Sequence, residues 1–133
     1  MSEFNLSHAV STLSGYVAAA NTLWGLFVVA TFAAAGFGAS MKDDFGVPTA
    51  AMLTIAYLAF AAAHLNALLL NLRVQRVIAD EIRASLARAP AGLTEYPLSV
   101  RAVVAASYRP AAAVAIHLVI DACVIGVAWS SIA

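Results

Sequence analysis

Three long apolar runs dominate the pattern of the chain. Residues 15–40 and 48–72 contain no Asp, Glu, Lys or Arg, and residues 110–133 contain only Asp121. An α-helix rises about 1.5 Å per residue, so about 20 residues cross the ~30 Å hydrocarbon core of a bilayer. Each run is longer than that, and some tilt or overrun is therefore expected. The sequence predicts an all-α integral membrane protein with three transmembrane helices in a single domain, residues 1–133.

Glycine, proline and apolar spacing indicate where these helices begin and end. The first span is predicted over about 15–38, and the third over about 110–132. The second begins at Pro48, which suits a first helical turn because it has a fixed φ and no N–H to lose. Residues 1–14 carry apolar side chains at helical spacing, which predicts a short N-terminal helix. This helix either extends the first span or lies in the membrane interface.

The second helix is predicted to continue past the membrane from about residue 72 to about 88. An apolar stripe recurs at helical spacing while the charged residues fall on other faces, so the continuation is predicted to be amphipathic and cytoplasmic. It either lies on the inner leaflet, with arginines near anionic headgroups, or packs against a partner helix. The narrow stripe favours packing. Residues 89–109 are predicted to form a cytoplasmic loop and a short helix. The stripe consists of Val74, Val77, Ile78, Ile82 and Leu86.

Composition supports the membrane assignment. The chain is 63% hydrophobic and 11% charged, against about 45–50% and about 25% in soluble domains. A water-soluble fold of this size could not bury so much apolar surface, so the lipid bilayer is a predicted partner. The one cysteine, Cys123, excludes an intramolecular disulfide and a cysteine-based metal site.

The charges are distributed unevenly although they sum to zero. The stretch between the second and third spans carries an excess of arginine, which by the positive-inside rule places it in the cytoplasm. The N-terminus is then cytoplasmic and the C-terminus outside, in the inner (plasma) membrane. Because flanking charge explains the arginines, nucleic-acid binding is not predicted. The arginines are Arg73, Arg76, Arg83, Arg88, Arg101 and Arg109.

Asp121 is the most unusual residue of the apolar runs. A charged side chain at the centre of a transmembrane helix costs about 2.5–3.5 kcal/mol on insertion scales, so it should face protein or water and have a partner. His117, one helical turn earlier, lies on the same face and is the nearest candidate.

Polar side chains of all three spans are expected to form a layer in the cytoplasmic half of the membrane. His64 lies eight residues before the end of the second span, and His117 lies seven residues after the start of the third. At 1.5 Å per residue the two histidines have similar depth. The candidate site residues are Asn21, Tyr57, His64, Asn71, His117 and Asp121.

Three interpretations of this layer remain open. It is structural if its side chains hydrogen-bond across helices and fix their register. It is an ion or proton pathway if the Asp and His side chains form a relay. It is a haem b site if His64 and His117 ligate the iron and Asp121 orients His117.

No motif of hydrolytic or group-transfer chemistry is present, so an enzyme is not expected. The leading hypothesis is a small membrane protein that acts as a homo-oligomer or as a subunit of a membrane complex and handles protons or ions through the layer. The alternatives are a haem-b-binding anchor of an electron-transfer complex, and a scaffold that recruits a cytoplasmic partner through helix 73–88.

Overall fold

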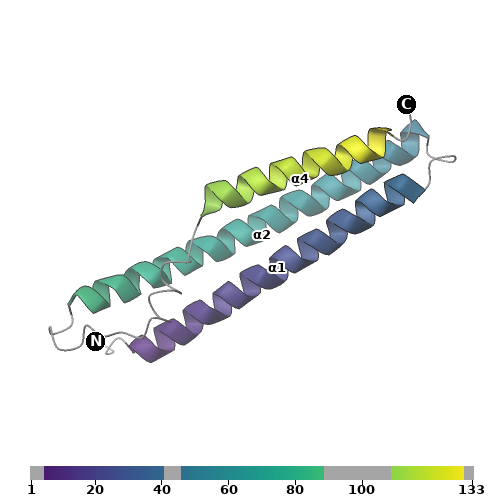
Figure 1. Ribbon diagram of the computed structural model, residues 1–133. Helices are drawn as coiled ribbons and strands as arrows, with labels where there is room; N and C mark the ends of the chain where they lie inside the picture. The colour runs from purple at the N-terminus through teal and green to yellow at the C-terminus, as the bar shows by residue number, and fades with distance from the viewer. Residues whose placement is uncertain (1–4, 41–45, 89–108, 131–133) are drawn as a thin grey trace. The chain divides into compact units, whose positions relative to one another are not determined.

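The computed structural model describes residues 5–40, 46–88 and 109–130, and within these ranges it contains three long α-helices and no strand. The helices are α1 (Leu6–Ser40), α2 (Val47–Ala87) and α4 (Pro110–Ser130) (Figure 1). All three are long and apolar enough to cross a membrane. The predicted all-α class with three candidate spans is thereby confirmed.

The helix ends differ in part from those expected. Helix α1 is one element of 35 residues that passes through Gly15 without interruption, so a separate N-terminal helix is absent from the described residues. Helix α2 is likewise one element, of 41 residues. The loop and short helix expected over 89–109 lie, apart from Arg109, outside the described residues.

Local signals in the sequence account for the helix starts. The Asn5 side chain accepts a hydrogen bond from the backbone N–H of His8 at 3.1 Å, which satisfies one of the unpaired N–H groups at the start of α1. Helix α2 opens with the Gly46 carbonyl accepting from the Ala50 N–H at 3.1 Å. Pro48 lies in the first turn, as expected.

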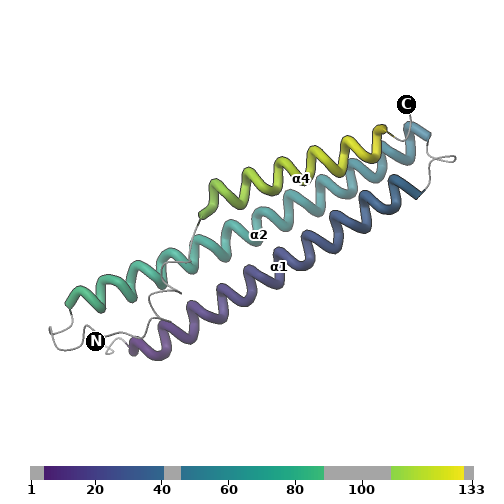
Figure 2. Tube along the Cα trace, in the orientation of Figure 1, coloured from purple at the N-terminus to yellow at the C-terminus, as the bar shows by residue number. Residues whose placement is uncertain are grey.

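The chain divides into two compact units, which are described separately below. The hairpin unit comprises Met1–Asn21 and Leu69–Arg109, and the three-helix unit comprises Thr22–Leu68 and Pro110–Ala133. Helices α1 and α2 each contribute residues to both units, whereas α4 belongs to the three-helix unit alone (Figure 2).

In the three-helix unit, parts of all three helices pack around a small core of Phe27, Tyr57, Ala61 and Val124. The C-terminal end of α4 approaches α1 closely, because a Cβ on Gly38 would lie 3.5 Å from the Ala128 Cα. Small residues of this kind let helices approach in lipid.

In the hairpin unit, the end of α2 packs against the start of α1. Leu13, Ala79 and Ile82 form its buried core. Three residues of the apolar stripe expected after residue 72, Ile78, Ile82 and Leu86, belong to this core or pack against it, whereas Val77 is exposed. Buried Gln75 joins the two helices by donating to the Tyr16 carbonyl at 3.2 Å.

Candidate functional site

Two histidines from different helices touch inside the three-helix unit. His64 of α2 is 6% exposed and His117 of α4 is 0% exposed. His64 Nδ1 lies 3.0 Å from His117 Nε2, and the ring centroids are 5.2 Å apart. The sequence predicted their shared depth, and the structure shows that they also face each other.

The outward nitrogens of this histidine pair bind backbone carbonyl groups. His64 Nε2 lies 2.8 Å from the Leu23 oxygen of α1. His117 Nδ1 lies 3.1 Å from the Ala113 oxygen, one turn earlier on α4. The pair thus links side-chain or backbone groups of all three helices, and every ring nitrogen has a polar neighbour.

Aromatic side chains enclose the histidine pair. Phe27 of α1 is fully buried and stacks on both rings, with centroid distances of 5.2 Å to His64 and 4.0 Å to His117. Trp24 contacts His117 at 4.9 Å, and Phe60 stacks on His64 at 5.7 Å. These contacts fix the ring orientations and surround the polar nitrogens with apolar surface.

A second polar contact joins α2 to α4 through Asp121. The Tyr57 hydroxyl donates to Asp121 Oδ1 at 2.9 Å and lies 3.2 Å from Thr31 Oγ1 of α1. Tyr57 is buried and Asp121 is partly buried. The carboxyl group expected to bind His117 therefore has Tyr57 as its hydrogen-bond donor, because both nitrogens of His117 are engaged elsewhere.

The structure brings together four of the six expected site residues. His64, His117, Tyr57 and Asp121 lie in the three-helix unit. In the remainder of this article they are called the His–Asp cluster.

Asn71 and Asn21 belong to the hairpin unit instead. The Asn71 side chain accepts from Gln75 at 2.7 Å, and Asn21 is exposed. Seven-residue spacing places Tyr57 and Asn71 on one helix face, but about 21 Å apart along the axis at 1.5 Å per residue. A shared helix face was therefore not enough to place a residue in the layer, because residues of one layer must also have the same depth.

Sequence reasoning missed several contributors to the site and one buried polar residue. Phe27 and Thr31 gave no signal, since one apolar and one small polar side chain are ordinary in a span. The Leu23 carbonyl could not be found, because a backbone group has no residue signature. Gln75 was detectable: it follows Asn71 by one helical turn, within the stripe that the hairpin unit buries.

The geometry of the histidine pair does not fit a haem iron. Metal–nitrogen bonds of about 2.0 Å would hold two ligating nitrogens roughly 4 Å apart on opposite sides of the metal. The facing nitrogens are 3.0 Å apart and in direct contact, and Phe27 stacks on both rings. The described residues also contain no group of three or more His, Cys, Asp or Glu side chains that could hold a metal ion.

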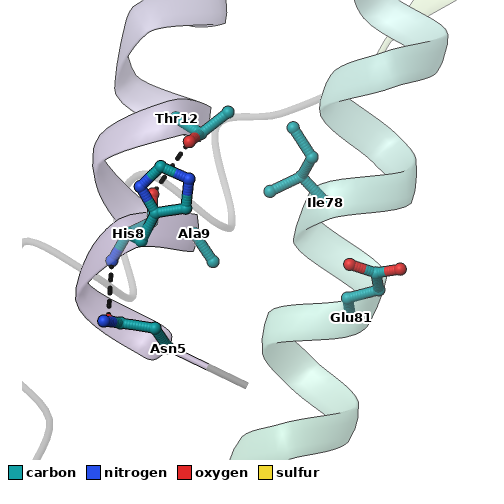
Figure 3. A pocket seen from close by; sticks show the side chains of 6 residues that line it. All are labelled: Asn5, His8, Ala9, Thr12, Ile78 and Glu81. Atoms are coloured by element: carbon teal, nitrogen blue, oxygen red, sulfur yellow. Dashed lines mark hydrogen bonds between the residues drawn. The ribbon is translucent and has the colours of Figure 1, made fainter. Parts of the chain in front are cut away.

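Two other hollows lie outside the His–Asp cluster. In the three-helix unit an apolar groove of about 200 Å³ is lined from α1 and α4, with Thr31 and Cys123 among its lining residues. In the hairpin unit a pocket of about 250 Å³ lies between α1 and α2 (Figure 3). Figure 3 shows His8 on one side and Glu81 on the other, and both are exposed. Neither hollow contains a buried polar side chain comparable to the histidine pair.

Comparisons with known proteins do not assign the chain to a family. No family model, no curated protein and no solved structure matches it. What can be stated is the class: an all-helical protein whose three apolar helices fit a membrane protein.

Proposed function

We propose that the protein is a small multi-pass membrane protein that handles protons through the His–Asp cluster. The observation that carries the proposal is the direct contact of buried His64 and His117 at 3.0 Å between two apolar helices. Ionisable side chains inside membrane spans commonly mark proton relays, and histidine exchanges protons near neutral pH. Asp121 and Tyr57 add a second group that can accept or donate a proton.

The same cluster also holds the three helices in register, and a purely structural role is the main competing explanation. Hydrogen bonds between transmembrane helices contribute about 0.6 kcal/mol on average, so such contacts are common as structural elements. A structural cluster needs no change of protonation. Proton movement is therefore the property that separates the two explanations.

The test is proton flux into liposomes containing the purified protein, driven by an imposed membrane potential and read by a pH-sensitive dye. We expect flux for the wild type and its loss in Asp121→Asn. Asp80→Asn is the matched control, since it removes the same charge from an exposed position of the hairpin unit. Equal, negligible flux in the wild type and in Asp121→Asn would exclude proton transport and leave the structural and scaffold explanations.

We further propose that the protein works as a homo-oligomer or as a subunit of a membrane complex. Ala59, Ala63 and Ala67 form an exposed stripe on α2, and Asn66 is exposed beside it. Small residues favour close helix contact in lipid, and a polar amide in lipid is stabilised by a partner. Size measurement in detergent tests this point, and a monomer with full flux would contradict it.

The proposed orientation has the N-terminus in the cytoplasm and the C-terminus outside, in the inner (plasma) membrane. It is supported by the arginines of the hairpin unit, of which Arg73, Arg76 and Arg83 are exposed on α2. Protease or glycosylation tags fused to each end would report the side on which that end lies. A cytoplasmic C-terminus would contradict the proposal.

A scaffold function has one supporting observation. Ile78, Ile82 and Leu86 of α2 pack in the core of the hairpin unit, while the charged side chains of Arg73, Arg76 and Asp80 are exposed. These exposed charges could recruit a cytoplasmic partner. Under this alternative, charge reversal at Arg73 would impair function, whereas Asp121→Asn would leave it intact.

A further inference from the structure

The contacts of His64 and His117 determine how many hydrogens the two rings carry. Each outward nitrogen faces a carbonyl oxygen, and a carbonyl oxygen only accepts hydrogen bonds. His64 Nε2 and His117 Nδ1 therefore each carry a hydrogen. In a neutral imidazole the other nitrogen is then an unprotonated acceptor.

Two neutral rings would consequently place two lone pairs against each other across the 3.0 Å contact. Both facing nitrogens would be buried acceptors without a donor, because each ring is surrounded by apolar side chains. A third hydrogen converts this repulsive contact into an N–H···N hydrogen bond. We infer that the His64–His117 pair binds one proton between its facing nitrogens and exists as an imidazole–imidazolium pair with a single positive charge.

This inference rests on the proposed proton-handling role and names the bound species and its place. The proton would lie between His64 Nδ1 and His117 Nε2, in contact with α2 on one side and α4 on the other. Loss of that proton leaves two hydrogens for three contacts, so one contact must open. All four ring nitrogens of the pair therefore have hydrogen-bond partners only when the shared proton is bound.

Asp121 supplies the balancing negative charge. The Tyr57 hydroxyl donates to Asp121, so the hydroxyl of Thr31 is the donor in its contact with the Tyr57 oxygen. A hydrogen bond donated to the carboxyl group stabilises its ionised form. Asp121 follows His117 by one helical turn, and the cluster as a whole is neutral. Neutrality lowers the penalty of holding charged groups away from water.

No other titratable side chain of the described segments faces the pair. The α1 segment of the three-helix unit, residues 22–40, contains none. The α2 segment contributes Tyr57, and α4 contributes Asp121 and an exposed cysteine, Cys123. Among these segments, Asp121 is therefore the group whose charge can match that of the bound proton.

The test is nitrogen NMR of ¹⁵N-histidine-labelled protein in lipid bilayers. The chain has three histidines, and exposed His8 of the hairpin unit provides an internal reference signal outside the pair. We expect three protonated nitrogens on the His64–His117 pair at neutral pH, a scalar coupling across the shared hydrogen, and loss of one proton as the pH is raised. Two protonated nitrogens and no coupling throughout the pH range, in folded protein, would overturn the inference.

A variant gives the second readout. In His117→Gln the amide can donate to His64 Nδ1 without an additional proton, so the protein should release one proton fewer than the wild type on alkaline titration. His8→Gln is the matched control, because it removes an exposed histidine of the hairpin unit and should leave the proton count of the His64–His117 pair unchanged. An unchanged proton count for the pair in folded His117→Gln would contradict a shared proton.

The proton count tests the shared proton, and the flux measurement tests transport, so a negative result in one leaves the other proposal standing. A shared proton without flux would retain this inference and remove transport from the proposed function. Flux without a shared proton would retain proton handling and assign it to Asp121 and Tyr57 instead.

Discussion

The hairpin unit and the three-helix unit arrange polar and apolar side chains in opposite ways. In the hairpin unit, Leu13 and Ile82 are fully buried, while Arg76 and Asp80 are exposed. In the three-helix unit, His64 and His117 are buried, while Phe32 is 74% exposed and other large apolar side chains are exposed as well. The same two helices, α1 and α2, take part in both arrangements.

The difference indicates which solvent each region is suited to. In water, the hydrophobic effect drives apolar side chains inward. In lipid that driving force between helices is absent, and packing with hydrogen bonds between helices stabilises the fold. On this basis we propose that the hairpin unit faces water and that the three-helix unit faces lipid.

The largest expected effect concerns Phe27. Replacing this fully buried ring by Ala removes its stacking on both histidines and leaves a cavity, so Phe27→Ala should lower the free energy of unfolding by about 3–5 kcal/mol. Phe32→Ala, at an exposed position of the same helix, should have a much smaller effect. Unfolding in mixed detergent micelles measures both, and equal losses would show that Phe27 is not a core residue.

A charge placed on each unit tests the comparison directly. Phe32→Lys should make the free energy of inserting α1 into the membrane less favourable by about 2.5–3.5 kcal/mol if this face contacts lipid. Val77→Lys, at a 59% exposed position of the hairpin unit, should change the free energy of insertion by less than about 0.5 kcal/mol if this position faces water. An insertion assay with glycosylation tags gives both values. A comparable penalty at residue 77 would place the hairpin unit in lipid.

Tyr57→Phe should have an intermediate effect. It removes the hydroxyl that donates to Asp121 and leaves the carboxyl group without that donor, which should cost about 1–2 kcal/mol. Tyr16→Phe is the control in the hairpin unit, because Gln75 binds the Tyr16 backbone carbonyl and the substitution retains it. The same micelle unfolding assay applies, and a loss as large in Tyr16→Phe would point to a general effect of tyrosine removal.

The smallest expected effect concerns the ion pairs of the hairpin unit. Asp80 binds Arg76 at 3.7 Å and also Arg83, and all three side chains are half exposed or more. Asp80→Asn should therefore cost only about 0.3–0.5 kcal/mol, and less at high salt, where exposed charges are screened. Glu81→Gln removes a carboxylate outside this cluster and serves as the control. An effect of Asp80→Asn that does not depend on salt would indicate that the ion pair is shielded from dissolved ions and is not exposed to water.

The fold was largely predictable because its main determinant is local. Runs of apolar residues longer than a bilayer is thick define the three helices, and Pro48 defines the first turn of α2. The division into two units was not predictable in the same way. It depends on which residues of α1 pack on α2, and contacts between two helices cannot be read from the pattern of either helix alone.

The site was predictable in depth but not in rotation. Counting residues from the ends of the spans placed His64 and His117 at one level, whereas their direct contact depends on how each helix turns about its axis. The pairing of Asp121 with His117 rested on spacing within one helix. Tyr57 binds Asp121 from another helix instead, and no spacing rule within a single helix could indicate that.

One contact of the cluster has a mechanical consequence. His64 binds the Leu23 carbonyl, a backbone group of α1, so an imidazole of α2 is tied to the main chain of its neighbour. If the shared proton leaves, one of three hydrogen bonds opens: the bond to the Leu23 carbonyl of α1, the bond to the Ala113 carbonyl of α4, or the bond between the two rings. The protonation state of the pair would then determine which helices remain hydrogen-bonded to each other. Helix movement in this chain would thereby depend on pH.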